Sequence, residues 1–162
     1  MTAPWKDRNV FRWRLDQEPQ EVGRARDGVR KALAGYELPV ALVDDVELVV
    51  SELVTNSIVH GAAPVTLTVQ VWHDRIRVCV TDASPQPLVP RQPDTGDERG
   101  RGLAIVTSCS AHWWVCTRHP GKDVWAEFHK PAAELPSWLL AAVPGQASYL
   151  PTSIYALRSQ EH

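Results

Sequence analysis

The sequence predicts an α+β fold, a two-layer sandwich in which a mostly antiparallel β-sheet carries helices on one face. Its 162 residues suit a single domain, and a hydrophobic content of 44% is enough for a packed core. The periodic segments follow the order strand, helix, helix, strand, strand, loop, helix, strand, strand. Because each pair of consecutive strands is joined by a short turn, antiparallel pairing is favoured over a doubly wound parallel sheet.

The first part of the pattern contains one strand and two helices. Residues 11–15 alternate apolar and basic side chains, as a half-buried strand does. A helix is predicted over 19–38, where apolar residues recur at helical spacing before a glycine and a proline. A second helix is predicted over 41–60, with Gly61 after its last turn. Its apolar stripe consists of Val46, Val49, Val50, Leu53 and Val54.

The second part contains two hairpins separated by a loop and a helix. Residues 82–99 hold four prolines and are predicted to form a functional or disordered loop. A helix is predicted over 103–111, and a turn over 119–122. The hairpin strands are predicted at 65–72 with 75–81, and at 113–118 with 124–130. We expect residues 1–10 to be an N-terminal arm, 11–130 the folded domain and 131–162 a C-terminal extension.

Composition narrows the class of protein. A formal net charge of −2 argues against nucleic-acid binding through bulk charge. No apolar window is long enough to span a membrane, and the first residues do not form a signal peptide. Cys79, Cys109 and Cys116 are an odd set without a C-x-x-C pair, which is typical of small buried side chains in a reducing compartment. We therefore expect a cytoplasmic protein with neither a nucleic-acid nor a membrane partner.

An acid and an amide share one face of the second predicted helix. Glu52 and Asn56 are four residues apart, so both lie beside the apolar stripe, neither fully buried nor fully solvated. A carboxylate there suits the activation of a hydroxyl or water, and an amide oxygen suits a hard cation such as Mg²⁺. The alternative is the polar flank of an amphipathic helix.

Two further motifs flank the predicted loop. Asp82 ends a strand, where its carboxylate could accept a hydrogen bond from an exocyclic amine such as that of adenine. The alternative is a turn aspartate. Gly100 and Gly102 form a G-x-G at the start of a helix, which permits close backbone approach to an anion. The alternative is a flexible loop end, because neither a Walker A nor a Rossmann motif is present.

Together these motifs resemble the GHKL ATPase superfamily, which has the Bergerat fold. The resemblance rests on E-x-x-x-N in a helix, an aspartate ending a hairpin strand, a long loop, and G-x-G-L opening a helix. It covers about residues 11–130. The stretch from Val50 to Gly61 and the compact size are most similar to the bacterial anti-sigma-factor serine protein kinases.

The resemblance implies a role for each motif. Asn56 would ligate Mg²⁺, Glu52 would be the general base for the attacking hydroxyl, and Asp82 would bind the adenine amine. Ser84 would belong to the nucleotide site, and residues 84–99 would form its lid. The phosphate site would be lined by Gly100, Arg101, Gly102 and Leu103. The implied cofactors are ATP and Mg²⁺.

The implied function is that of a serine/threonine protein kinase that phosphorylates a small anti-anti-sigma-like protein and binds a sigma factor, in a family whose members often form homodimers. The alternative is a protein-interaction module without kinase activity, with or without bound ATP. The sequence departs from the family at two positions. Ser84 stands where D-x-G has glycine, and Asp123 is assigned the place of a threonine near the adenine, where a carboxylate would disfavour phosphate.

Overall fold

The computed structural model describes residues 9–87 and 101–131. The chain divides into two units, residues 1–130 and 131–162, and all the described helices and strands belong to the first. Most of the predicted N-terminal arm, most of the predicted lid, and the C-terminal extension beyond residue 131 lie outside the described residues.

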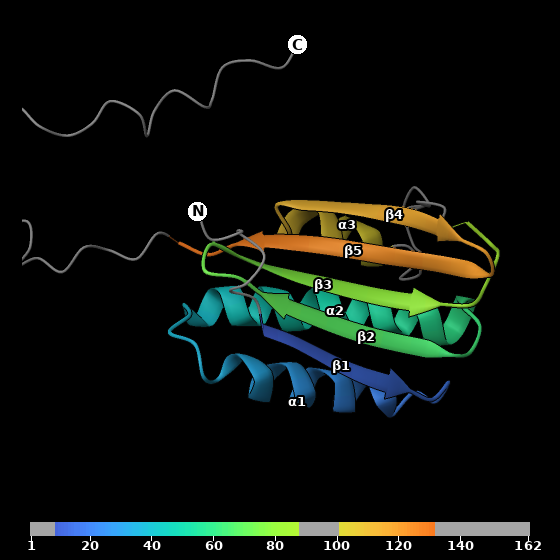
Figure 1. Ribbon diagram of the computed structural model, residues 1–162, viewed down its shortest axis with the longest axis horizontal. Helices are drawn as coiled ribbons and strands as arrows, with labels where there is room; N and C mark the ends of the chain where they lie inside the picture. The colour runs from blue at the N-terminus through green and yellow to red at the C-terminus, as the bar shows by residue number, and fades with distance from the viewer. Residues whose placement is uncertain (1–8, 88–100, 132–162) are drawn as a thin grey trace, which may run out of the picture. The chain divides into compact units, whose positions relative to one another are not determined.

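The described strands form one five-stranded sheet in which every neighbouring pair is antiparallel (Figure 1). Their order across the sheet is β1-β2-β3-β5-β4, so β5 lies between β3 and the edge strand β4. The strands are β1 (Asn9–Leu15), β2 (Val65–Val71), β3 (Arg75–Asp82), β4 (His112–Arg118) and β5 (Gly121–His129).

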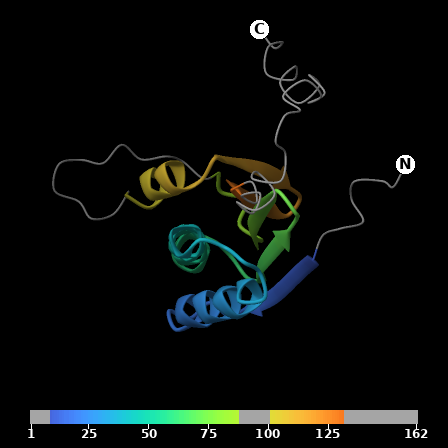
Figure 2. The ribbon, with the colours of Figure 1, turned by 90° about the vertical axis from the view of Figure 1, so that its left-hand side faces the viewer.

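The helices lie together on one face of this sheet (Figure 2). They are α1 (Glu21–Leu33), α2 (Val40–His60) and α3 (Arg101–Cys109). The long helix α2 contacts β2, β3 and β5, and both α1 and α3 pack against it. The predicted two-layer α+β sandwich with helices on one face is therefore confirmed.

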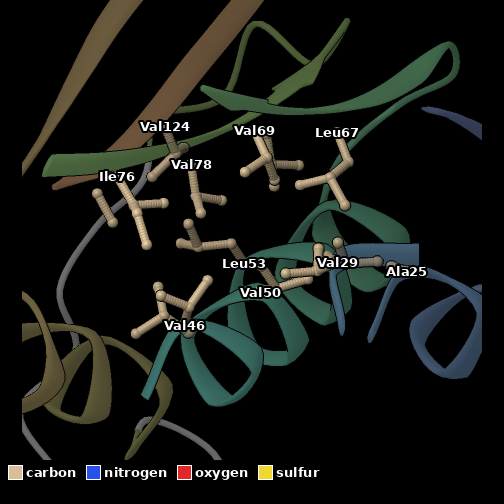
Figure 3. Close-up of a cluster of buried hydrophobic side chains, with 14 of the residues drawn as sticks. Ala25, Val29, Val46, Val50, Leu53, Leu67, Val69, Ile76, Val78 and Val124 are labelled. Carbon is tan, nitrogen blue, oxygen red and sulfur yellow. The ribbon is translucent and has the colours of Figure 1, made fainter. Parts of the chain in front are cut away.

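The core lies between the sheet and α2, as Figure 3 shows. Alternate residues of the central strands point toward the helices and are buried, as expected for a two-residue strand period. All five residues of the predicted α2 stripe are at most 1% exposed, so the predicted stripe is confirmed. Burial of this stripe fixes the rotation of α2 and therefore the direction in which its polar flank faces.

The opposite face of the sheet, on which none of the described helices lies (the helix-free face), carries an aromatic and charged cluster. The Arg77 guanidinium lies over the rings of Trp72 and Trp114, 5.2 Å and 5.5 Å from their centroids. Trp114 stacks on Trp125 with ring centroids 5.9 Å apart. Arg77 Nε also donates to Glu127 Oε2 at 2.5 Å, which joins β3 to β5. These tryptophans pack on the sheet surface instead of filling the core.

Two predicted helix ends are wrong. The first helix ends at Leu33 and not at residue 38, although Tyr36 and Leu38 beyond it still pack against the core. The chain then turns, with the Tyr36 N–H donating to the Leu33 carbonyl at 3.0 Å. The third helix ends at Cys109 and not at residue 111, since the Ala111 N–H donates to the Glu127 carbonyl, next to the first residues of β4.

The last strand begins three residues earlier than predicted. Gly121 has a φ of +106°, which favours glycine and lets the chain turn immediately after β4. The predicted four-residue turn is therefore shorter, and Lys122 and Asp123 belong to β5.

The predicted burial of the cysteine side chains is confirmed for Cys79 and wrong for Cys116, while Cys109 is half-buried. Among the described residues all three cysteines are free, but only Cys79 is buried and Cys116 is exposed on β4. Burial raises the pKa of the Cys79 thiol to about 12, which keeps it protonated and unreactive. In the part of the chain that the structure describes, no helix combines the length and apolarity needed to cross a membrane.

Candidate functional site

The polar flank of α2 faces the first turn of α3. Glu52 and Asn56 are both half-buried, as their four-residue spacing predicts. Gly102 lies directly against them: a Cβ atom at this glycine would be 2.6 Å from Glu52 Oε2 and 3.7 Å from Asn56 Nδ2. A side chain at position 102 would therefore occupy the space in front of the carboxylate and the amide. The structure brings together three of the predicted site residues at this point.

The environment of Glu52 changes its acidity. Partial burial raises the pKa of the Glu52 carboxyl above its ordinary value, because the charged form is less well solvated there. A carboxylate with a raised pKa binds a proton more readily than an exposed one. The direction of this change in pKa is the one that favours a role in accepting protons.

Asp82 forms a second cluster at the end of β3. Its side chain is fully buried and receives three hydrogen bonds. Ser57 Oγ donates to Asp82 Oδ2 at 3.1 Å, and the Ser84 N–H donates to Oδ1 at 2.9 Å. Lys122 Nζ donates to the same Oδ1 at 3.0 Å. Ser84 therefore contributes to this cluster through its backbone.

Two glycines make the close packing around Asp82 possible. A Cβ atom at Gly61 would overlap the Ser57 carbonyl and lie 3.0 Å from Asp82 Oδ2. A Cβ atom at Gly121 would overlap the backbone of Asp82. Gly61 itself has a φ of −89°, so close approach and not a left-handed backbone explains the absence of a side chain there. Within residues 9–87 and 101–131 only Gly121 has a positive φ, so the serine at position 84 does not strain the backbone.

The two clusters are connected through α2. Asn56 belongs to the first cluster and Ser57, the next residue, belongs to the second. Neighbouring residues of α2 therefore reach the two clusters. Asn56 lies against Gly102, and Ser57 binds the buried Asp82. Segments separated by tens of residues in the sequence meet along the C-terminal half of α2.

The position assigned to Asp123 is wrong. Asp123 lies opposite Thr81 in the β3–β5 register and receives a hydrogen bond from Thr81 Oγ1 at 2.6 Å. It also forms an ion pair with Arg118. Because its neighbour Val124 points into the core, Asp123 points to the helix-free face, away from Asp82. The residue opposite Asp82 is Lys122, which sequence analysis did not identify because the start of β5 was placed too late.

The remaining predicted site residues are only partly described. Leu103 is half-buried in α3, one residue after Gly102. Arg101 begins α3, but its side chain lies outside the described part of the structure. Gly100 lies outside the described residues. The geometry of the predicted phosphate site is therefore described from Gly102 onward.

The residues present fit Mg²⁺ and a nucleoside triphosphate. A carboxylate and a carboxamide lie side by side against Gly102, and their oxygens are donors of the type that Mg²⁺ prefers. Within the described residues, no group of three or more His, Cys, Asp or Glu side chains could hold a metal by itself.

Comparisons with known proteins place this geometry in a family. The family model described as a histidine kinase-like ATPase domain matches residues 15–128. The solved RsbU and RsbW domains of a Mycobacterium tuberculosis protein match with a TM-score of 0.60 and 17% identity, over 77% of this chain and 34% of that chain. A histidine kinase domain from the blue-light activated histidine kinase of Erythrobacter litoralis has a TM-score of 0.45 and 22% identity, over 68% and 59%. A comparison with curated proteins found no match.

The chain spans about a third of the length of the solved chain that contains the RsbU and RsbW domains, and the likeness to it shows a shared fold. The family model reaches from the end of β1 to the end of β5, so it includes every described residue of both clusters. The GHKL resemblance is confirmed at this level. The chain therefore belongs to the histidine kinase-like ATPase domain family.

Proposed function

We propose that this protein is an Mg-ATP-binding regulatory serine/threonine protein kinase of the anti-sigma-factor type. The observation that carries the proposal is the convergence of Glu52 and Asn56 on Gly102, with Asp82 held one residue further along α2 by Ser57. Membership of the ATPase family supports ATP binding. The similarity of residues 50–61 to the anti-sigma-factor kinases supports the finer assignment.

The proposed reaction divides the work between the two clusters. Asn56 would hold Mg²⁺, which when bound supplies charge neutralisation at the phosphate oxygens. Glu52 would accept the proton of the attacking hydroxyl. The hydroxyl oxygen would form a bond to the γ-phosphorus while the bond between that phosphorus and the ADP oxygen breaks. Asp82 would accept a hydrogen bond from the adenine amine. Ser84, Gly100, Arg101, Gly102 and Leu103 would complete the nucleotide site.

The proposed protein substrate is a small anti-anti-sigma-like protein that presents a serine or threonine hydroxyl. We propose a sigma factor as a second partner and a homodimer as the functional state, both from the resemblance to the anti-sigma-factor kinases. A cytoplasmic location follows from the same proposal.

A second candidate function has its own supporting observation. Because Lys122 already neutralises Asp82, the carboxylate does not need a nucleotide to satisfy its charge. A protein-interaction module that regulates a partner without transferring phosphate is consistent with this ion pair.

Calorimetric titration with Mg-ATP tests the first function. We expect the wild type to bind, Asn56→Ala to lose the Mg²⁺-dependent part of its affinity, and Glu52→Gln to bind normally. We also expect Glu52→Gln to lose about a hundredfold or more of the phosphoryl transfer rate to a co-purified partner. Thr55→Ala is the matched control, since Thr55 lies on the exposed face of the same helix turn.

The absence of nucleotide binding in the wild type would exclude the kinase and leave the interaction module. Retained transfer activity in Glu52→Gln would exclude Glu52 as the base. The raised pKa of Glu52 adds a second readout: the transfer rate should fall with decreasing pH at a higher pH than for an ordinary glutamate, because the protonated carboxyl cannot act as a base.

A further inference from the structure

The carboxylate of Asp82 has little remaining capacity for a ligand. A carboxylate accepts about four hydrogen bonds, two at each oxygen. Oδ1 already accepts from the Ser84 N–H and from Lys122 Nζ. Oδ2 accepts from Ser57, so one acceptor position remains there, but the Asp82 side chain is 0% exposed and offers no free approach to it. A purine amine that binds Asp82 must therefore replace one of the existing donors.

Only one of the three donors can leave without disturbing the fold. The Ser84 donor is a backbone N–H, and Ser57 is a buried residue of α2. Lys122 instead carries its ammonium on a flexible four-carbon stem, with three N–H donors that suit alternative partners. Its side chain is 9% exposed, whereas that of Asp82 is 0% exposed, so the lysine is the member of the pair in contact with solvent.

We propose that Lys122 is the residue that sets base specificity and affinity at this site, because its ammonium occupies the position on Asp82 that the exocyclic amine of adenine would take. The inference rests on the proposed nucleotide binding. For ATP to bind, the ammonium must swing away from Oδ1, and the loss of this charged hydrogen bond lowers the affinity for ATP.

The ion pair between Lys122 and Asp82 favours a purine that has a carbonyl oxygen in place of the exocyclic amine. Inosine triphosphate carries a carbonyl oxygen where ATP carries the amine. That oxygen can accept a hydrogen bond from Lys122 while the lysine keeps its ion pair with Asp82. Without the ammonium, the carbonyl oxygen would face an uncompensated carboxylate and be repelled. Lys122 therefore reduces the preference for an amino-purine over an oxo-purine.

Calorimetric titration with Mg-ATP and Mg-ITP tests the proposal in the wild type, in Lys122→Met and in Lys130→Met. Methionine keeps an apolar stem and removes the ammonium. Lys130 is a matched control at the other end of β5, where its ammonium contacts the Trp72 carbonyl at 3.1 Å and not Asp82. We expect Lys122→Met to bind ATP about tenfold more tightly, equivalent to about 1.4 kcal/mol, and to bind ITP more weakly. The control should match the wild type.

Removal of the ammonium leaves a buried charge unpaired, and this can unfold the variant. Lys122→Gln keeps a neutral donor and gives the same comparison if Lys122→Met does not fold. A wild type that binds ATP, together with a Lys122 variant whose ATP affinity and ATP-to-ITP ratio are unchanged or lower, overturns the specificity role alone. Absence of binding in every variant overturns this inference and the proposed function together. Binding that appears only in the Lys122 variants supports the role of Lys122 and excludes the proposed kinase function of the wild type.

Discussion

At the residue scale, the absence of a side chain at position 102 decides how closely α3 approaches the polar flank of α2. Gly102 lies so close to Glu52 that an added Cβ atom would be 2.6 Å from Oε2. Any larger residue would displace the carboxylate beside which a phosphate and its metal are proposed to lie.

Gly102→Ala tests this close approach. The added methyl group would lie 2.6 Å from Glu52 Oε2, so the flexible carboxylate must rotate away from its position. We expect phosphoryl transfer to fall about tenfold or more, while the free energy of unfolding changes by no more than about 1 kcal/mol, since alanine is favourable in a helix. Rate measurements and urea unfolding check the two effects.

Gly23→Ala in α1 is the control, because nothing lies within 4 Å of its added Cβ. Unchanged transfer in Gly102→Ala would show that the position of Glu52 does not matter for the reaction.

The positions of Glu52 and Asn56 were predictable from the sequence, whereas the position of Lys122 was not. The shared face of Glu52 and Asn56 follows from helix geometry alone, because four residues nearly complete one turn. The contact between Lys122 and Asp82 depends on strand register, and a shift of one residue reverses the face to which a side chain points. That register is set by Gly121, whose positive φ the sequence did not reveal.

At the element scale, an ion-pair network joins the neighbouring strands β3 and β5 on the helix-free face. Glu127 of β5 contacts Arg77 and Arg75 of β3, at 2.5 Å and 3.6 Å. Burial alone would raise the pKa of Glu127, but the hydrogen bond from Arg77 and the two arginine charges lower it below the ordinary value of 4.5. The strand pair is thus stabilised by a carboxylate that must remain ionised.

The sign of the pH effect follows from this lowered pKa. Because the folded protein holds the proton of Glu127 less tightly than the unfolded chain, the group stabilises the fold above about pH 4.5. That contribution is lost as the pH falls through the folded-state pKa. We expect Glu127→Gln to be less stable than the wild type at pH 7, and the difference to shrink below pH 4.5.

Urea unfolding at a series of pH values measures this difference. Glu37→Gln, at an exposed position before α2, is the control and should show no such convergence. A stability difference that does not vary with pH would exclude the ionised carboxylate as the source of the stabilisation.

The existence of each described element was predictable, whereas several of the ends were not. The apolar stripe of α2 repeats over many turns and identifies the helix unambiguously. The end of α1 was not predictable, because Tyr36 and Leu38 continue the apolar pattern beyond it and a proline six residues after Leu33 is too distant to mark it.

At the scale of the whole molecule, one core unites all the described elements. Its members extend from Leu15 in β1 to Phe128 in β5, so the chain must be complete between these positions before the core can close. The antiparallel order of the sheet was predictable because two hairpins are local in sequence. The insertion of β5 between β3 and β4 was not, since nothing in a strand's own sequence specifies a non-local neighbour.

We expect a fragment of residues 9–131 to fold by itself, because the described core lies within it. Its thermal midpoint should lie within about 5 °C of the full chain, equivalent to about 1 kcal/mol for a domain of this size. Calorimetric unfolding measures the midpoint. A fragment of residues 9–118 lacks β5 and should not unfold cooperatively, since β5 pairs with two strands. Loss of cooperative unfolding in the 9–131 fragment would show that residues 1–8 or 132–162 are required for folding.

The junction between α3 and the sheet has a practical consequence. Trp113 of β4 donates its indole N–H to Thr107 Oγ1 of α3 at 2.9 Å, and its ring packs against the core. Indole emission responds to the loss of such a bond, so displacement of α3 would change the colour and intensity of the protein's own fluorescence. The fold therefore contains a native optical sensor for the helix that begins beside Glu52, and a Trp113→Phe difference spectrum isolates its signal without any attached dye.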